Sequence, residues 1–127
     1  MRISEAARRI GVPEHVLRHW DEVGAVSPGR SAAGHRDYSE EHLHRLRVLR
    51  ACQDVGMSLA EITLVLHRDE AGRAEVIAHR RAQLRRQRER LEDAERFLEH
   101  VADCRHDLLT RCPSCRRYAA DEGASPA

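Results

Sequence analysis

The chain has 127 residues, of which 41% are hydrophobic and 34% are charged. This length allows one ordinary domain, or a smaller globule with an extended segment, and so low an apolar share indicates exposed helical surface or an interface completed by a partner. The net charge of +1 neither requires nor excludes a nucleic-acid partner. All 22 residues counted as Lys or Arg are arginine, whose guanidinium suits phosphate and base edges.

The N-terminal stretch contains no long apolar run. We therefore expect neither a signal peptide nor a membrane span, and we place the protein in the cytoplasm. Thiols stay free in that reducing compartment unless they bind metal or act as redox switches. Because three of the four cysteines are clustered near the end of the chain, they indicate a site and not a disulfide scaffold.

Two short helices open the chain. The first has apolar residues at helical spacing: Ile3, Ala6, Ala7 and Ile10. Ser4 is its predicted cap and Gly11 its predicted stop. The second begins near Pro13 and ends at Gly24. Two short helices joined by a tight, glycine-containing turn form a helix-turn-helix.

A β-hairpin wing is predicted next, because residues 25–39 fit no helical period and are punctuated by proline and glycine. It carries Arg30, His35, Arg36 and Tyr38.

Two further helices follow the wing. Ser39 is the predicted cap of the first, and Gly56 its stop. Its apolar stripe consists of Leu43, Leu46, Val48, Leu49 and Cys52. We place its arginines, Arg45, Arg47 and Arg50, on a solvated face, with contact to a DNA backbone as the alternative. Ser58 and Glu61 have the spacing of a capping box and open a helix that runs through Leu66.

A long helix is predicted from about residue 70 to 103, where proline is absent. It has an apolar residue every seven positions: Ile77, Leu84, Leu91 and Leu98. We call this row of residues the seam of the helix, and the predicted elements before it, residues 1–68, the head. So narrow an apolar row cannot be buried against so small a head. We therefore expect the helix to pair with a second copy of itself as a coiled-coil-like dimer. The alternative is a solitary charged helix, stabilised by pairs such as Glu89 with Arg85 and Arg88 with Glu92.

These elements, in this order, resemble the mercury-resistance regulator (MerR) family of transcription factors. The matching stretches are ISEAARRIGVPEHVLRHWDEVGAVSP, GHRDYSEEHLHRLRVLRACQDVGMSLAEI and the cysteine-bearing end. The likeness covers nearly the whole chain, and it is most specific in the head. It departs from the family at RHWDE, where members usually carry Arg-Tyr-Tyr-Glu.

The resemblance implies a mainly α fold: a winged helix-turn-helix head with a short β-hairpin wing, a helix pair, and a long antiparallel coiled-coil dimerisation helix. We expect the DNA-binding domain at residues 1–68 and the dimerisation helix at 69–103. An effector loop with a short helix follows at 104–119, and a disordered tail at 120–127.

The predicted DNA contacts follow from the way a recognition helix enters the major groove, with polar residues outward and its other face packed inside. Arg18 can bond a guanine edge in two places, and the wing residues would hold the phosphate backbone. The full predicted set is Glu14, His15, Arg18, His19, Trp20, Arg36 and Tyr38.

Three of these predictions have structural alternatives. Arg18 could pair with Asp21 or Glu22 at the surface. Trp20 could pack inside, and Tyr38 could be a core residue with its hydroxyl at the rim.

The resemblance also implies a mechanism. Family dimers sit on promoters whose two recognition elements are too far apart for RNA polymerase. Binding of the effector bends and untwists the intervening DNA and realigns those elements, at a cost of a few kcal/mol.

The cysteine cluster has the pattern C-x7-C-P, formed by Cys104, Cys112 and Pro113. It resembles the loop of copper- and zinc-responsive members, in which two cysteines ligate the metal, so Cys104 and Cys112 are the predicted ligands of a soft metal ion, Cu(I) or Zn(II). Two thiolates suffice for a linear monovalent ion, whereas zinc requires about four ligands, and His106 and Cys115 are the secondary candidates.

Other roles for the cluster remain open. Residues 67–81 contain only His67 and His79 as further candidates and no cysteine, which argues against a three-thiolate mercury site; His79 could act from the partner subunit. Cys112 and Cys115 could instead form a redox-sensing pair, or the cluster could be a structural metal site or simply packed.

We therefore expect a homodimeric regulator of double-stranded promoter DNA that works with RNA polymerase and responds to a soft metal. One alternative is the same regulator responding to oxidants, electrophiles or another ligand. Another is a helical adaptor without DNA binding. We do not expect an enzyme, because no nucleophile triad, phosphate-binding loop or paired carboxylate stands out.

Overall fold

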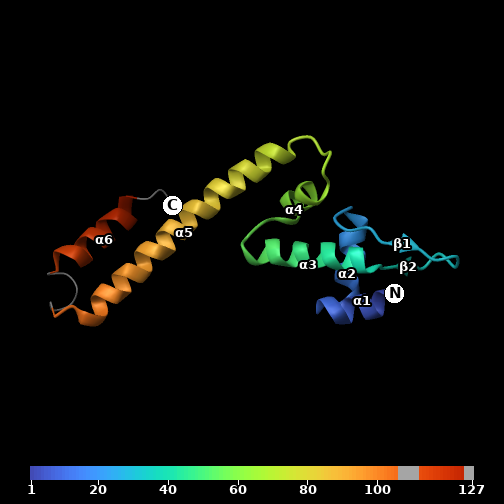
Figure 1. Ribbon diagram of the computed structural model, residues 1–127, viewed down its shortest axis with the longest axis horizontal. Helices are drawn as coiled ribbons and strands as arrows, with labels where there is room; N and C mark the ends of the chain where they lie inside the picture. Colours follow the sequence, from blue (N-terminus) through green and yellow to red (C-terminus); the bar gives the residue numbers. More distant parts are fainter. Residues whose placement is uncertain (106–111, 125–127) are drawn as a thin grey trace. The chain divides into compact units, whose positions relative to one another are not determined.

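The computed structural model describes residues 1–105 and 112–124, with the side chains described through residue 120. It divides into two compact units, residues 1–80 and 81–127, each of which is considered by itself. The helix α5, Arg73–Asp103, contributes to both. Figure 1 shows the order of the elements.

The first unit begins with the predicted pair of helices, α1 (Ile3–Ile10) and α2 (Glu14–Glu22). Gly11 ends α1 as predicted, with a left-handed φ of 80° and its N–H bonded to Ala7 O at 2.8 Å. The predicted cap was wrong: Arg2, not Ser4, holds the N-cap position, because the Ala6 N–H already reaches Arg2 O at 3.1 Å.

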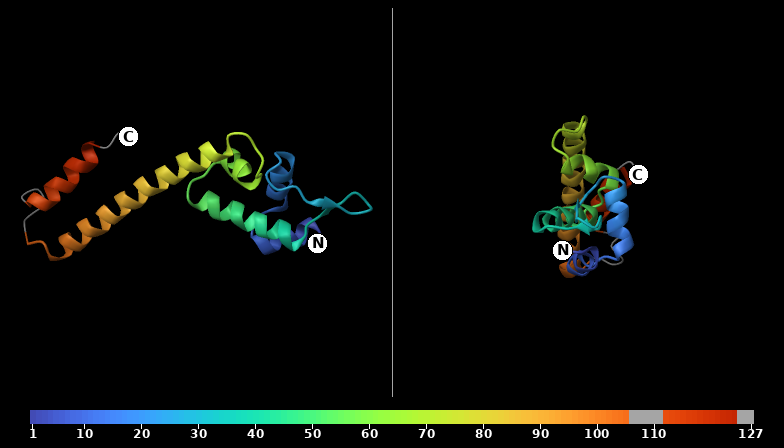
Figure 2. Two further views of the ribbon diagram at one scale, coloured as in Figure 1. Left: turned by 45° about the horizontal axis from the view of Figure 1, so that its top comes forward. Right: turned by 90° about the vertical axis from the view of Figure 1, so that its right-hand side faces the viewer.

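The wing is a two-stranded antiparallel hairpin of β1 (Gly29–Arg30) and β2 (Arg36–Asp37). Its register pairs Gly29 with Asp37 and Arg30 with Arg36. The hairpin projects from the helices of its unit, as Figure 2 shows. The predicted wing is therefore confirmed.

The helices α3 (Glu40–Asp54) and α4 (Leu59–Leu66) complete the head. Both begin with a capping box, in which the serine hydroxyl accepts a backbone N–H while the side chain three positions later accepts the serine N–H. In α3 the pair is Ser39 and His42, and in α4 it is the predicted pair, Ser58 and Glu61.

One buried cluster holds α1 to α4 and the wing together. Its largest fully buried side chains are Leu17, Val26, Tyr38, Leu43, Leu46, Leu49 and Ile62. Cys52 is half-buried and packs against this cluster, as predicted.

Two arginines of α3 were assigned to a solvated face, and the structure corrects this. Arg50 donates to Ile10 O at 3.1 Å, at the end of α1, and Arg45 donates to Leu66 O at 2.5 Å, at the end of α4. Both bonds satisfy helix-terminal carbonyls that have no partner within their own helix. These two arginines are therefore part of the packing of the head.

In the second unit, α6 (Pro113–Ala124) turns back along the C-terminal part of α5. Phe97 of α5 and Tyr118 of α6 stack with their ring centroids 4.4 Å apart and their planes 11° apart. Because α6 continues to Ala124, the prediction of a disordered tail from residue 120 was wrong for residues 120–124. Residues 125–127 lie outside the described residues.

The predicted seam of α5 lies open along much of its length in a single chain. Leu91 and Leu98 are each 63% exposed, whereas Ile77 and Leu84 are half-buried. Of the pairs expected for a solitary helix, Arg88 and Glu92 lie 3.7 Å apart, and both are well exposed. Such pairs contribute little to stability. Within the described residues, no helix is long and apolar enough to cross a membrane.

Candidate DNA-binding face and metal site

The polar face of α2 is where the sequence predicted it. His15, Arg18 and His19 are exposed, and Glu14 is partly so. Arg18 pairs with Glu14 at 3.5 Å, one turn earlier on the same helix, instead of with Asp21 or Glu22. The side chain of Arg18 is 45% exposed, so this weak pair leaves its guanidinium available to a ligand.

Two residues of the predicted DNA-contacting set belong to the core. Trp20 is only 4% exposed, on the face of α2 that packs inside the head, and we correct its assignment accordingly. Tyr38 is 1% exposed, and its hydroxyl has no hydrogen-bond partner among the described residues. Burial raises the pKa of Tyr38. In this conformation neither side chain offers surface to DNA.

The wing arginines are held by one carboxylate that the sequence analysis did not assign to them. Asp21 of α2 accepts hydrogen bonds from Arg36 at 2.7 Å and from Arg30 at 3.3 Å. The hydrogen bond to Asp21 raises the pKa of the Arg36 guanidinium above its ordinary value. Asp21 thus fixes the wing against the recognition helix.

A cationic depression of about 350 Å³ lies between the start of α1, α2 and the wing. It is lined by Arg2, Ile3, Arg18, Arg30, Gly34, His35 and Arg36. Four guanidinium groups on one surface form the electrostatic footprint expected of a site for a phosphate backbone. The structure therefore brings the predicted Arg18 and Arg36 together and adds Arg2.

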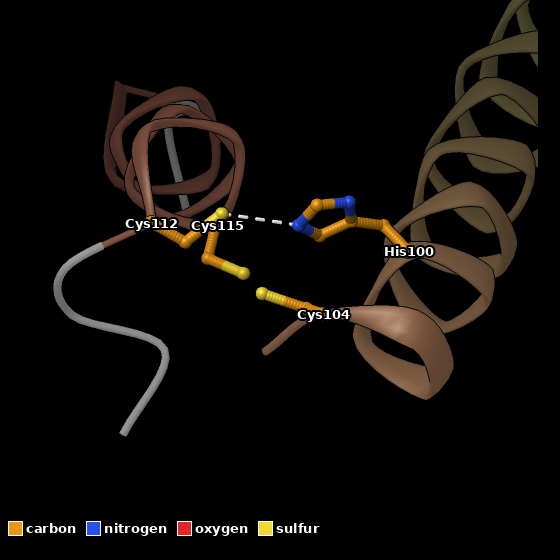
Figure 3. A group of neighbouring side chains, drawn as sticks. All are labelled: His100, Cys104, Cys112 and Cys115. Atoms are coloured by element: carbon orange, nitrogen blue, oxygen red, sulfur yellow. Dashed lines mark hydrogen bonds between the residues drawn. The ribbon is translucent and has the colours of Figure 1, made fainter. Parts of the chain in front are cut away.

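The second site is a cluster of four metal-ligand side chains in the second unit: His100, Cys104, Cys112 and Cys115 (Figure 3). Their donor atoms all lie within 4.8 Å of one another. His100 Nε2 is 3.1 Å from Cys112 Sγ. Cys112 and Cys115 are buried, and the other two are half-buried.

Local helix geometry explains this convergence. His100 lies in the last turn of α5, and Cys104, four residues later, follows directly after the helix with its N–H bonded to Val101 O at 3.3 Å, so the two lie on the same side of the helix end. Cys112 immediately precedes Pro113, the first residue of α6, and Arg116 N–H donates to its carbonyl at 3.0 Å. Proline is favoured at the first position of a helix, and Cys112 therefore occupies the N-cap position of α6.

The free N–H groups of the first turn of α6 act on the Cys112 sulfur. The N–H of Cys115 lowers the pKa of Cys112 to about 6, and His100 and the N–H of Ser114 contribute in the same direction, against the effect of burial. Burial, followed by the neighbouring Cys112, raises the pKa of Cys115 to about 11. The cluster therefore combines Cys112, the thiol whose pKa is lowered, with three further donors.

The donor set fits a soft metal ion. In a tetrahedral site with metal–sulfur bonds of about 2.3 Å and metal–nitrogen bonds of about 2.0 Å, neighbouring donor atoms lie roughly 3.5–3.8 Å apart. The separations in the cluster, all below 4.8 Å, need only small side-chain adjustments to reach such values. Thiolate and imidazole are also the ligands that Cu(I) and Zn(II) prefer.

The cysteine spacing predicted three of these four residues, and His100 was missed. The available signal was the spacing of His100 and Cys104, which places two ligand residues on one helical side. His106, a predicted secondary ligand, lies outside the described residues. His67 bonds to Gly24 O at 2.7 Å, and His79 is exposed on α5 and is not a member of the cluster.

Comparison with known proteins identifies the family. A sequence model described as "MerR HTH family regulatory protein" matches residues 1–69, which is more than half of the chain. The chain belongs to the MerR family. A second model, described as "MerR, DNA binding", matches residues 43–101. Members of this family are DNA-binding transcription regulators, not enzymes.

Two curated relatives align along nearly the whole chain. The HTH-type transcriptional regulator HmrR of Sinorhizobium medicae (strain WSM419) is 32% identical, over 98% of this chain and 90% of its own. The heavy metal-dependent transcription regulator 2 of Rhizobium meliloti (strain 1021) is 31% identical, over 94% of this chain and 86% of its own.

Solved structures show the same fold. A MerR-family regulator from Listeria monocytogenes superposes with a TM-score of 0.68 at 21% identity, covering 97% of this chain and 96% of its own. HiNmlR, a MerR-family regulator that lacks the sensor domain and was solved bound to promoter DNA, superposes with a TM-score of 0.57 at 23% identity, covering 78% of each chain.

Proposed function

We propose that this MerR-family protein binds promoter DNA as a homodimer and controls transcription in response to a soft metal ion, Cu(I) or Zn(II), held by Cys104 and Cys112. The observation that carries the metal response is the convergence of these thiols with two further donors at the C-terminal end of α5. A regulator of promoter DNA acts where the chromosome is, so we expect the protein in the cytoplasm.

The surface of the head supports contact with double-stranded DNA. Arg18 and His19 on α2 are exposed, and the wing presents Arg36 beside the same cationic depression. Guanidinium groups on α2 can reach base edges in the major groove. Those on the wing are suited to phosphates, which position a protein on DNA without specifying sequence.

The charges of α5 support pairing of two chains in antiparallel orientation. Residues 80–90 contain six arginines and one glutamate, whereas residues 91–103 contain five acidic residues and one arginine. Antiparallel pairing places the basic half of each helix against the acidic half of the other, while parallel pairing places like charges together. The exposed Leu91 and Leu98 supply the apolar contact that such a pair would bury.

The metal response is supported by the donor set and by the relatives. The Rhizobium meliloti relative is named for dependence on a heavy metal and aligns over 94% of this chain. When bound, the ion would connect the end of α5 to the start of α6 through Cys104 and Cys112. An effector changes a conformational equilibrium only as far as it prefers one state, and distorting a promoter costs a few kcal/mol. A tightly held ion can supply that difference and so realign the promoter for RNA polymerase.

The test uses the reduced, full-length protein under anaerobic conditions, with a DNA fragment that the protein selects from a random-sequence pool. We expect a footprint with two-fold symmetry that changes when Cu(I) or Zn(II) is added. Cys104→Ser and Cys112→Ser should still bind the fragment but lose the change. A footprint that responds to peroxide and to neither metal would overturn metal sensing.

DNA recognition is tested by Arg18→Ala. Losing a base-edge contact should weaken binding to the selected fragment by about 1–3 kcal/mol, without changing thermal stability, because the side chain is exposed. Arg117→Ala, an exposed arginine on α6, is the matched control and should bind DNA as the wild type does. Equal binding by both variants would remove Arg18 from the DNA-contacting face.

A further inference from the structure

The metal-ligand cluster contains two more donors than a two-thiolate site requires. Besides Cys104 and Cys112, the imidazole of His100 and the thiol of Cys115 have their donor atoms inside the same 4.8 Å group. A linear two-coordinate ion is favoured where other donors are kept at a distance. Here two donors stand close enough to complete a four-coordinate shell.

Helical structure positions the two additional donors. His100 lies in α5, which ends at Asp103, and Cys115 lies in the first turn of α6. The close-up in Figure 3 shows both side chains directed toward Cys104 and Cys112 from opposite helices. Stacking of Phe97 on Tyr118 joins the same two helices close to the cluster. The donors of one chain are therefore enough to fill a tetrahedral shell.

The charge of this donor set favours a divalent ion. Three thiolates and a neutral imidazole around a divalent ion leave a net charge of −1, whereas a monovalent ion leaves −2. Cys112 and Cys115 are buried, and buried net charge is costly. A set of three cysteines and one histidine is also one of the common tetrahedral zinc sites.

The cluster has an open surface depression beside it. A depression of about 430 Å³ opens beside His100 and Cys104, and it is also lined by Arg96, Glu99 and Asp103. Two of its five lining residues carry carboxylates, which can attract and exchange a hydrated divalent cation.

We propose that His100, Cys104, Cys112 and Cys115 form one closed, four-coordinate site within a single chain, and that this site selects a divalent tetrahedral ion such as Zn(II) over two-coordinate Cu(I). His100 is the fourth ligand. The inference rests on the proposed function for the identity of the site, and it adds the ligand set and the class of ion.

The test is X-ray absorption spectroscopy of the Zn(II)-loaded, reduced full-length protein without DNA, together with the visible spectrum of the Co(II)-substituted form. We expect three sulfur neighbours at about 2.3 Å and one nitrogen at about 2.0–2.1 Å, and the intense visible bands of tetrahedral Co(II). His100→Gln should remove the nitrogen and lower Zn(II) affinity more than about 10-fold, because even loss of an outer-shell partner costs that much.

His79→Gln, an exposed histidine elsewhere on α5, is the matched control and should leave spectrum and affinity unchanged. Cys115→Ser is the second variant and should remove one sulfur neighbour. A shell of two sulfurs alone, or a His100→Gln protein that behaves like His79→Gln, would overturn the proposal.

The outcome is independent of the DNA experiment above. A four-coordinate site in a protein whose footprint ignores metals would support this inference and contradict the proposed metal response. A footprint that responds to Cu(I) bound by two sulfurs would support the proposed metal response and contradict the four-coordinate site.

Discussion

At the scale of single residues, Asp21 has the largest predicted effect on the DNA-binding face, because it bonds both Arg36 and Arg30. Asp21→Asn removes a negative charge from a surface that meets phosphates, so charge alone would strengthen DNA binding. We expect the opposite, a roughly fivefold loss of affinity, since fixing a charged pair is worth about 1 kcal/mol. Fluorescence anisotropy with the selected DNA fragment measures this change.

The control for Asp21 is Glu22→Gln, which removes the same charge from the exposed neighbouring residue. It should leave DNA affinity unchanged or slightly higher. If Asp21→Asn instead strengthened DNA binding as this control does, Asp21 would not position the wing.

Sequence spacing predicted which residues of α2 face outward. The pairing of Arg18 with Glu14, one turn apart on the same helix, was also within its reach. The pairing of Arg36 with Asp21 was not, because it depends on how the wing folds back on α2, and no local periodicity contains that information. Trp20 was misassigned because a tryptophan ring can either pack in the core or contact DNA, and only the tertiary structure decides which of the two it does.

At the scale of elements, the start of α5 is joined to α4 by a two-point ion pair. Arg80 donates to Glu61 through two nitrogens, at 2.6 and 3.1 Å, and Glu61 also accepts the N–H of Ser58. The Arg80 bond is the largest cause of the pKa of Glu61 falling to about 2. The Glu61 carboxylate therefore both caps the N-terminus of α4 and holds the start of α5 against α4.

A pH dependence of stability follows from this shift. Because the pKa of Glu61 is lower in the folded than in the unfolded protein, its stabilising effect is complete above the unfolded value. That effect is lost as the pH falls from about 4.5 toward 2. In urea titrations, wild type should be more stable than Glu61→Gln near neutral pH, and the difference should shrink across that window.

Glu41→Gln, at an exposed position in the first turn of α3, is the control for this titration. It should show a much smaller change across the same window. A difference between wild type and Glu61→Gln that stays constant down to pH 2 would contradict the role given to the ion pair.

Element boundaries were predicted well where a side chain or glycine closes the helix end. Gly11, Ser39 and Ser58 all act through short-range bonds to the backbone, which sequence spacing encodes. The extent of α6 was underestimated because residues 119–124 are small or acidic and offer no large apolar side chain, a composition that also fits a disordered tail. For the metal site, the pattern of cysteines identified Cys104 and Cys112, whereas the role of His100 depends on α6 folding back along α5.

At the scale of the whole molecule, the exposed leucines of α5 predict the oligomeric state. Leu91→Glu should convert the dimer to a monomer and raise its dissociation constant by more than about 100-fold. Burying a leucine is worth roughly 1.5–3 kcal/mol, and each dimer loses two. Sedimentation equilibrium measures this constant, while circular dichroism should show unchanged helix content.

Val55→Glu is the comparison variant, because Val55 is an exposed apolar residue outside α5, 46% accessible. It should remain dimeric. A wild-type protein that sediments as a monomer at all concentrations would contradict the dimer and favour a solitary helix.

In the proposed function, metal held by the cysteine cluster changes the DNA and not only the protein. The direct measurement is energy transfer between dyes at the two ends of the selected fragment, in a preformed complex, before and after one equivalent of Zn(II) per chain. We predict a change in transfer without dissociation, and no change with Cys112→Ser. Stoichiometric metal binding with unchanged energy transfer in the wild-type complex would contradict the proposed metal response.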